Sequence, residues 1–110
     1  MRQGEIWYAD LNPVKGSEQK GYRPVVIISG NVVNTYLQIV IACPLTSKIK
    51  NYKGNIVLSP DNENGLSETS EVMVFHIRSI SKERLVKKLG KISTKELDLL
   101  KEGLSDILKY

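Results

Sequence analysis

Short runs of β-branched and aromatic residues, separated by turn residues, constrain the fold of this chain more than any other feature. Residues 25–28 are continuously β-branched, which predicts a strand buried on both faces. Four other segments have a similar character: residues 6–11, 36–43, 55–58 and 71–77. In a chain of 110 residues, this pattern predicts a single domain over the whole length, built on a small and strongly curved antiparallel barrel.

The C-terminal segment has a helical period instead. Ser93 and Glu96 have the spacing of a capping box, and Ile92 and Leu97 are placed to form a hydrophobic staple across it. Apolar residues then recur on one helical face: Leu97, Leu100, Leu104 and Ile107. This face is expected to pack on the sheet, or alternatively on a partner subunit. The predicted fold class is α+β, mainly β, with an amphipathic helix capping the barrel.

The net charge favours a polyanionic partner. The chain has 16 Lys and Arg residues against 12 Asp and Glu residues, which gives a net charge of +4, and neutralising phosphates releases bound counterions. Other proteins carry the same charge for solubility alone. The longest apolar runs are far shorter than the roughly 20 residues of a membrane span, and the N-terminus leads into no signal-peptide core. We therefore expect a cytoplasmic protein without membrane contact.

Most familiar catalytic constellations are absent from the sequence. Cys43 is the only cysteine and His76 the only histidine, which excludes a histidine pair within one chain. The chain contains no Walker A loop, no GxGxxG or HExxH motif, and no cluster of His, Cys and Asp at metal-ligand spacing. No metal and no cofactor are therefore predicted. Cys43 ends an apolar run, so a buried structural thiol is favoured over a nucleophile.

The remaining polar residues suit the cleavage of RNA, because RNA carries its own nucleophile. A ribose 2′-hydroxyl can attack the adjacent phosphorus if a protein orients it, stabilises the phosphorane charge and protonates the leaving oxygen. Arg23 suits the stabilising role because its planar guanidinium matches phosphate oxygens, and Thr46 offers a hydroxyl at a strand end. Both also have ordinary explanations: Arg23 as a surface charge before a proline, and Thr46 with Ser47 as part of a turn.

Four segments, in chain order, resemble the motifs of the MazF/PemK toxin family, and together they cover essentially the whole chain. Residues 4–13 (GEIWYADLNP) resemble its N-terminal signature, and residues 16–28 contain its most specific motif, GSEQ followed by a short spacer and RPVVII. Residues 44–47 (PLTS) resemble the end of its third strand, and residues 77–85 (IRSISKERL) resemble its final-strand motif.

This resemblance implies an SH3-like barrel, a homodimer, and sequence-specific cleavage of single-stranded RNA that leaves a 2′,3′-cyclic phosphate and a 5′-hydroxyl. It implies that Arg23 and Thr46 are the catalytic residues. It also implies a small acidic antitoxin, similar to MazE, whose tail occupies the RNA groove. The residues expected to bind RNA are Ser17, Glu18, Gln19, Lys20, Ser47, His76 and Arg78.

The loop over residues 14–22 is expected to close on RNA as a mobile gate. Its polar run, residues 17–20, lacks the apolar residues that would pin it to the barrel. Its glycines, Gly16 and Gly21, allow hinge-like changes of the backbone. The alternative is a rigid connector between two strands.

One position departs from the family pattern. Many members carry an acidic residue followed by Gln before the Ile-Arg or Pro-Arg pair, whereas this chain has Phe75 and His76 there. Any role of that acidic group therefore cannot be transferred to this chain. His76 either replaces it as a proton carrier or base contact, or packs beside the barrel.

Two other functions are compatible with such a barrel. A gyrase poison of the related CcdB type is disfavoured because those toxins end in Trp-Gly-Ile, whereas this chain ends in residues 107–110 (ILKY). A non-catalytic SH3-like module that only binds RNA is disfavoured by the presence of both Arg23 and Thr46.

Overall fold

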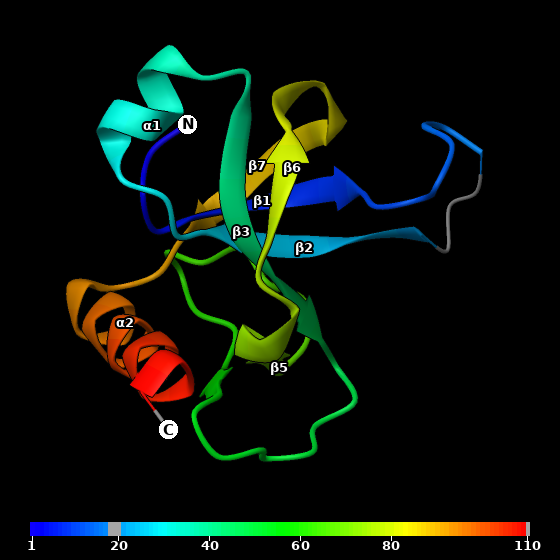
Figure 1. Ribbon diagram of the computed structural model, residues 1–110. Helices are drawn as coiled ribbons and strands as arrows, with labels where there is room; N and C mark the ends of the chain where they lie inside the picture. Colours follow the sequence, from blue (N-terminus) through cyan, green and yellow to red (C-terminus); the bar gives the residue numbers. More distant parts are fainter. Residues whose placement is uncertain (18–20, 110) are drawn as a thin grey trace.

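A curved antiparallel sheet with one long helix against it makes up the molecule, in a computed structural model that describes residues 1–17 and 21–109 (Figure 1). The sheet contains β1 (Glu5–Asp10), β2 (Tyr22–Ile27), β3 (Ile39–Thr46), β4 (Ile56–Leu58), β5 (Ser70–Val72), β6 (Arg78–Ser81) and β7 (Leu85–Lys91). The remaining elements are the helices α1 (Asn31–Tyr36) and α2 (Thr94–Lys109) and the 3-10 turns η2 (Val74–His76) and η3 (Lys82–Arg84). The predicted fold class, a curved antiparallel sheet with a C-terminal helix, is confirmed.

The strand β3 connects the parts of the sheet. The strand order is β4-β5-β3-β2-β1-β7, and β6 also pairs with β3. The ladder between β3 and β2 ends at the pair Val25–Pro44, and the last two residues of β3, Leu45 and Thr46, pair with β5. The β2 ladder and the β5 ladder run along opposite edges of β3, and the β2 ladder ends before the last two residues of β3.

Side chains alternate between two hydrophobic cores, because successive residues of a strand point to opposite faces. We call inner core the cluster formed by Ala9, Val25, Ile27, Val40, Ala42, Ile80 and Leu85. We call outer core the cluster formed by Ile6, Val26, Cys43, Leu45, Leu58, Leu66, Val72, Val74, Ile92 and Leu100. Cys43 is fully buried, and burial raises its pKa to about 12, which fits the predicted structural thiol.

The helix α2 begins and packs as its sequence predicts. The N–H of Glu96 donates to Ser93 Oγ at 3.0 Å, and the N–H of Ser93 donates to the Glu96 carboxylate at 2.8 Å, which completes the capping box. Leu100 is fully buried in the outer core. The other apolar residues of this face pack against the same core: Leu97, Leu104 and Ile107. In the described part of the chain, no helix has the length and apolar character needed to span a membrane.

The strand predicted over residues 36–43 exists as β3, but its predicted start is wrong. Asn31–Tyr36 forms the helix α1, and β3 starts only at Ile39. A local polar network explains the helix: Asn34 is buried, its Nδ2 donates to the Ser29 carbonyl at 2.9 Å, and the Ser29 hydroxyl donates to Asn34 Oδ1. Hydrophobic periodicity contains no trace of such a network.

The prediction of a single strand over residues 71–77 is also wrong. The strand β5 ends at Val72, the turn η2 follows, and β6 begins at Arg78. The side chain of Asn55, from a distant loop, accepts a hydrogen bond from Val74 N–H at 3.1 Å and so fixes the turn.

Candidate active site

Arg23 and Thr46 lie just beyond the last pair of the β2–β3 ladder, two residues from Val25 and Pro44 respectively. Continuing the β2–β3 register two residues beyond the pair Val25–Pro44 sets Arg23 opposite Thr46. The last pair of this ladder is Val25–Pro44, and on the opposite edge of β3 Thr46 pairs with Glu71 of β5. The two residues predicted to be catalytic therefore lie at the same end of the ladder, although they are far apart in the sequence.

The pleat of the strands places both side chains on one face of the sheet. Arg23 is two residues before Val25, and Thr46 is four residues after Ala42, and both apolar residues belong to the inner core. Arg78 lies on the same face, because it pairs directly with Ala42. Arg23 and Thr46 are half-buried, and Arg78 is exposed. Two guanidinium groups and a hydroxyl thus share one face of the sheet.

The Thr46 hydroxyl takes part in the turn that follows β3. Its Oγ1 accepts a hydrogen bond from the N–H of Lys48 at 3.1 Å, as expected for a threonine that begins a turn. This bond uses a lone pair of the oxygen, and a hydroxyl also has one proton to donate. The turn therefore orients the hydroxyl and leaves its proton for a ligand such as a phosphate oxygen.

A cleft of about 710 Å³ adjoins this pair. Its walls come from the tyrosines of β1 and β2, from residues 45–48 at the end of β3, and from residues 65–68 before β5. Arg23 and Thr46 both lie among its lining residues. Among the described residues that line it, two cations, Arg23 and Lys48, stand against one carboxylate, Glu68. The cleft thus favours an anionic ligand.

The comparison with known proteins decides the family. Residues 2–108 match the model of the family described as PemK-like, MazF-like toxin of type II toxin–antitoxin system. The chain belongs to this family.

Individual relatives agree with this membership. Endoribonuclease MazF9 of Mycobacterium tuberculosis is 37% identical over 110 residues, which cover 94% of this chain and 92% of that protein. Endoribonuclease MazF of Staphylococcus saprophyticus is 39% identical over 100 residues, covering 88% and 82%. The crystal structure of MazF from Deinococcus radiodurans is similar with a TM-score of 0.80 at 26% identity, covering 100% of this chain and 97% of that one. The resemblance inferred from the sequence motifs is confirmed.

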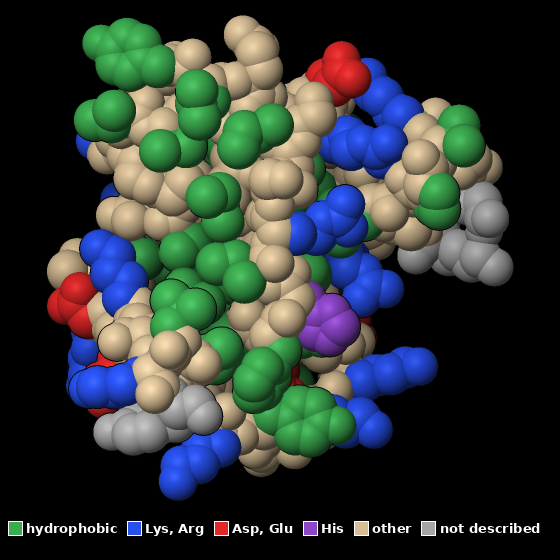
Figure 2. Space-filling model, viewed as in Figure 1, with side chains coloured by type: hydrophobic (Ala, Val, Ile, Leu, Met, Phe, Trp, Pro, Cys, Tyr) green, Lys and Arg blue, Asp and Glu red, His purple; other side chains and the backbone are tan. Residues whose placement is uncertain are grey.

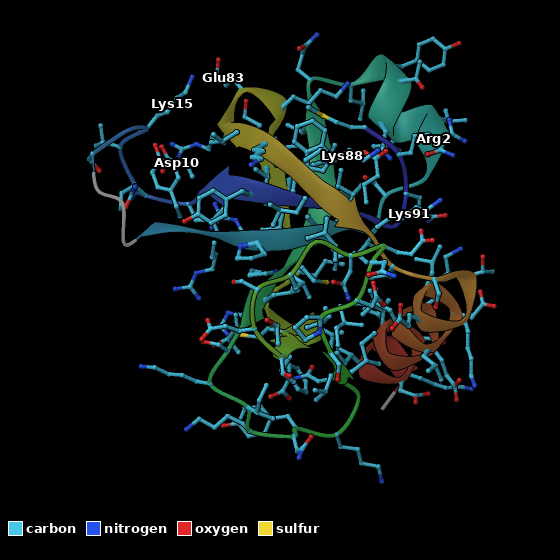
Figure 3. All side chains as sticks on the ribbon, turned by 180° about the vertical axis from the view of Figure 1, so that it is seen from behind. Arg2, Asp10, Lys15, Glu83, Lys88 and Lys91 are labelled. Carbon is cyan, nitrogen blue, oxygen red and sulfur yellow. The ribbon has the colours of Figure 1, made fainter. Side chains whose placement is uncertain are left out.

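In this MazF-like chain, the loop after β1 is held at its base by Asp10, which lies with Lys15 at the same end of the sheet (Figure 3). The Asp10 carboxylate accepts hydrogen bonds from the N–H groups of Asn12 and Gly16 and from the Asn12 side chain. Burial alone would raise the pKa of Asp10, but these bonds and the charge of Arg84 lower it. Arg84 Nη1 also donates to the carbonyl oxygens of Asp10 and Asn12, at 3.1 and 2.6 Å.

The other end of this loop is fixed by close packing. The N–H of Leu11 donates to the Gly21 carbonyl at 3.0 Å. A Cβ on Gly21 would lie 1.8 Å from Asn12 Oδ1, so a larger residue there would have to displace the Asn12 side chain. Ser17 is exposed and is not among the residues that line the cleft. The other predicted loop residues, Glu18, Gln19 and Lys20, lie outside the described residues, so the gate stays a prediction.

The remaining predicted RNA-binding residues fall in three places. Ser47 lines the cleft beside Thr46. Arg78 lies on the inner face, as described above. His76 ends the turn η2 and is exposed, outside the lining of the cleft. An exposed imidazole disfavours the alternative in which His76 packs beside the barrel.

A buried carboxylate supports the segment that carries Thr46. Glu71 is 1% exposed, and it accepts four hydrogen bonds of 2.7–3.1 Å. The donors are the backbone N–H groups of Lys50, Asn51 and Tyr52 and the side-chain amide of Asn55. Burial alone would raise the pKa of Glu71, but these donors outweigh it and lower the pKa. One side chain therefore fixes the loop that follows Thr46.

Sequence reasoning missed several residues of this region. Lys48 could have been found, because it is a cation two positions after a predicted catalytic residue. Glu68 lies next to a turn-rich connector, where no pattern marks a site. Tyr8 and Tyr22 meet only through the register between β1 and β2. Among the residues that the structure describes, no group of three or more His, Cys, Asp and Glu side chains is placed to hold a metal ion.

Proposed function

We propose that this chain is a toxin that cleaves single-stranded RNA at a specific sequence, as a metal-independent endoribonuclease. The observation that carries the proposal is the placement of Arg23 opposite Thr46 on one face of the sheet, just beyond the last pair of the β2–β3 ladder. Membership of the toxin family and the endoribonucleases among its relatives support the activity.

In the proposed reaction, a ribose 2′-oxygen attacks the adjacent phosphorus, and the bond from phosphorus to the 5′-oxygen of the next nucleotide breaks. The 2′-hydroxyl loses its proton and the leaving 5′-oxygen gains one, so the products are a 2′,3′-cyclic phosphate and a 5′-hydroxyl. Arg23 stabilises the charge of the phosphorane, and Thr46 donates its hydroxyl proton as a hydrogen bond to a phosphate oxygen. Arg23 acts by its charge, because a guanidinium stays protonated.

Residues around this pair are proposed to hold the flanking nucleotides. Arg78 supplies a second cation for the phosphate backbone on the same face. Ser47 and the exposed His76 offer hydrogen bonds to bases or phosphates. The predicted loop residues Ser17, Glu18, Gln19 and Lys20 are proposed to close over the RNA from the base that Asp10 anchors.

Cleavage should therefore persist when divalent metal ions are removed. Incubation with mixed-sequence single-stranded RNA in EDTA should give cuts at one recurring motif, and end mapping should find 2′,3′-cyclic phosphates. RNA with 2′-deoxyribose at the attacked position should stay intact, because the nucleophile is missing. A requirement for added metal, or cleavage of the deoxy RNA, would contradict the mechanism. Binding without cleavage would instead favour a non-catalytic module.

The proposed protein partner is an acidic antitoxin, similar to MazE. The family is defined as the toxin half of a type II pair. Carboxylates of an antitoxin tail would take the place of RNA phosphates near Arg23, Lys48 and Arg78, and the net charge of +4 would speed association. Excess antitoxin should therefore stop the cleavage in the assay described above.

We also propose a homodimer, through an exposed apolar surface. Hydrophobic side chains gather along the face shown in Figure 2. The dimer patch is formed by five residues that are 41–79% exposed: Val32, Tyr36, Leu37, Phe75 and Ile77. Trp7 packs against the inner core, and Leu97, Leu100, Leu104 and Ile107 of α2 belong to the outer core or pack against it, so these side chains do not belong to the patch.

Sedimentation velocity at micromolar concentration should give the mass of a dimer. Phe75→Lys should shift the protein toward the monomer, because it places a charge within the proposed apolar contact. The matched variant Val57→Lys changes another exposed apolar residue, outside the patch, and should leave the dimer intact. A monomeric wild-type protein under these conditions would contradict the proposal.

A further inference from the structure

The cleft beside Arg23 and Thr46 has an aromatic wall that the proposed reaction does not use. Tyr8 on β1 and Tyr22 at the start of β2 have ring centroids 5.8 Å apart, with the ring planes at 47°. Both side chains are half-buried, and both line the cleft. The buried Leu45 continues this apolar surface. Such a wall suits a planar, largely apolar group.

Tyr22 is fixed in its position by Asp10. Burial, the charge of Asp10 and a hydrogen bond to its carboxylate raise the pKa of Tyr22, so the phenol stays protonated and donates to Asp10. Asp10 itself is 2% exposed and is held by the N–H groups of Asn12 and Gly16. The Tyr22 ring is therefore a preorganised surface, and its orientation is tied to the base of the loop after β1.

The other side of the cleft is polar and charged. Ser47 and Lys48 come from the turn after β3, and Ser67 and Glu68 come from the segment before β5. A carboxylate accepts a hydrogen bond from the exocyclic amine of a base, and serine hydroxyls donate or accept. Proteins hold bases of single-stranded RNA with this combination, an aromatic surface for stacking and polar groups for the base edge. A cleft of about 710 Å³ has room for one nucleotide.

We propose that this cleft binds one nucleobase of the substrate, next to the cleaved phosphate, with the ring stacked on Tyr8 and Tyr22 and its edge facing Glu68. The inference rests on the proposed function and deepens it, because it names a specificity subsite. We expect the bound base to carry an exocyclic amine, because the amino group of adenine, cytosine or guanine donates to Glu68 from the base edge, whereas uracil offers only its ring N3–H. A phosphate held by Arg23 and Thr46 adjoins this base, because both residues are among those that line the cleft.

The test measures binding of an uncleavable oligoribonucleotide that contains the target motif and has 2′-deoxyribose at the attacked position. Each RNA of a series has one abasic site, at a different position near the cleavage position, and fluorescence anisotropy gives the Kd of each RNA. For the wild-type protein, we expect one abasic position to weaken binding about 5- to 100-fold, the range for loss of one stacked base. Replacing the base at that position by uracil should also weaken binding. Glu68→Gln should reduce this difference in Kd between the original base and uracil.

The double variant Tyr8→Leu, Tyr22→Leu should bind the intact RNA more weakly and lose its sensitivity to that abasic position. The double variant Tyr8→Phe, Tyr22→Phe should keep the sensitivity, because phenylalanine rings still stack. Tyr52→Leu is the matched control, since Tyr52 is 58% exposed and does not line the cleft. Each comparison uses two RNAs on the same variant, so a reduced folded fraction does not mimic the expected result.

Equal sensitivity to the abasic position in the wild-type protein and in the leucine variant would overturn the subsite. Cleavage of RNA by the wild-type protein in the same preparation would leave the proposed function standing. If the wild-type protein neither binds nor cleaves any RNA, the proposed function fails, and the subsite fails with it.

Discussion

Arg23→Ala should slow RNA cleavage by about 100-fold or more, the scale seen when one preorganised donor to a developing negative charge is removed. Arg23 lies on the same face as Thr46, in the part of β2 before Val25, where the ladder with β3 has ended. A phosphate at this position gains most from the guanidinium when charge accumulates on the phosphorane. Single-turnover cleavage of a short RNA with one target motif, at saturating enzyme, measures this effect directly.

The fold of this variant should survive, because Arg23 is half-buried at a strand mouth and belongs to neither core. Thermal melting should show this. Lys53→Ala is the matched control: it also removes one positive charge, but Lys53 is exposed and outside the cleft, so the rate should stay near that of the wild type. Arg23→Lys should give an intermediate rate, because the ammonium keeps the charge and loses the planar fork. Near-normal cleavage by Arg23→Ala would make Arg23 a surface charge.

Local sequence patterns predicted some elements of this fold well and missed others for a physical reason. The strands β1, β2 and β4 and the helix α2 have apolar periodicity or end signals within their own residues. The strand β7 (LVKKLGK) has three lysines and little apolar character, and it exists because it pairs along the free edge of β1. Such pairing is a tertiary property, and strand propensity depends strongly on the neighbouring strand.

The same distinction applies to the site. Arg23 and Thr46 were predictable because each belongs to a motif that resembles the family, and the structure places both among the residues that line one cleft. The aromatic wall was not predictable, since Tyr8 and Tyr22 approach each other only through pairing of β1 with β2. Nor was the support of Thr46 by Glu71. A glutamate within an apolar strand pattern gives no sign that four donors from another segment will surround it.

Glu71→Gln should destabilise the folded protein by roughly 2–4 kcal/mol at neutral pH, because hydrogen bonds to a charged acceptor are the strong ones and buried donors without partners are costly. The carboxylate now accepts from the N–H groups of Lys50, Asn51 and Tyr52 and from Asn55. A glutamine has one acceptor oxygen and turns an NH₂ group toward donors that need acceptors. Chemical denaturation of the two proteins at neutral pH measures the difference.

The acid dependence of stability should change as well. The pKa of Glu71 is lowered in the folded protein from an ordinary value of 4.5, since burial opposes ionisation but the four donors outweigh it. The folded state therefore prefers the carboxylate more than the unfolded state does. This contribution is fully present above the ordinary pKa and is lost as the pH falls through the lowered folded value. The wild-type protein should lose this part of its stability on acidification, and Glu71→Gln should not.

The variant should also loosen the segment that follows Thr46. Amide hydrogen exchange at residues 50–52 should be faster in Glu71→Gln than in the wild type, while exchange in the outer core at Val26 stays slow. Glu102→Gln is the matched control, because Glu102 is an exposed carboxylate on α2, and it should change neither stability nor the acid dependence. Since Glu71 pairs with Thr46, the loosened loop should lower the cleavage rate even where the variant is fully folded. If Glu71→Gln kept the stability, the acid dependence and the amide exchange of the wild-type protein, the loop would hold its position without this carboxylate.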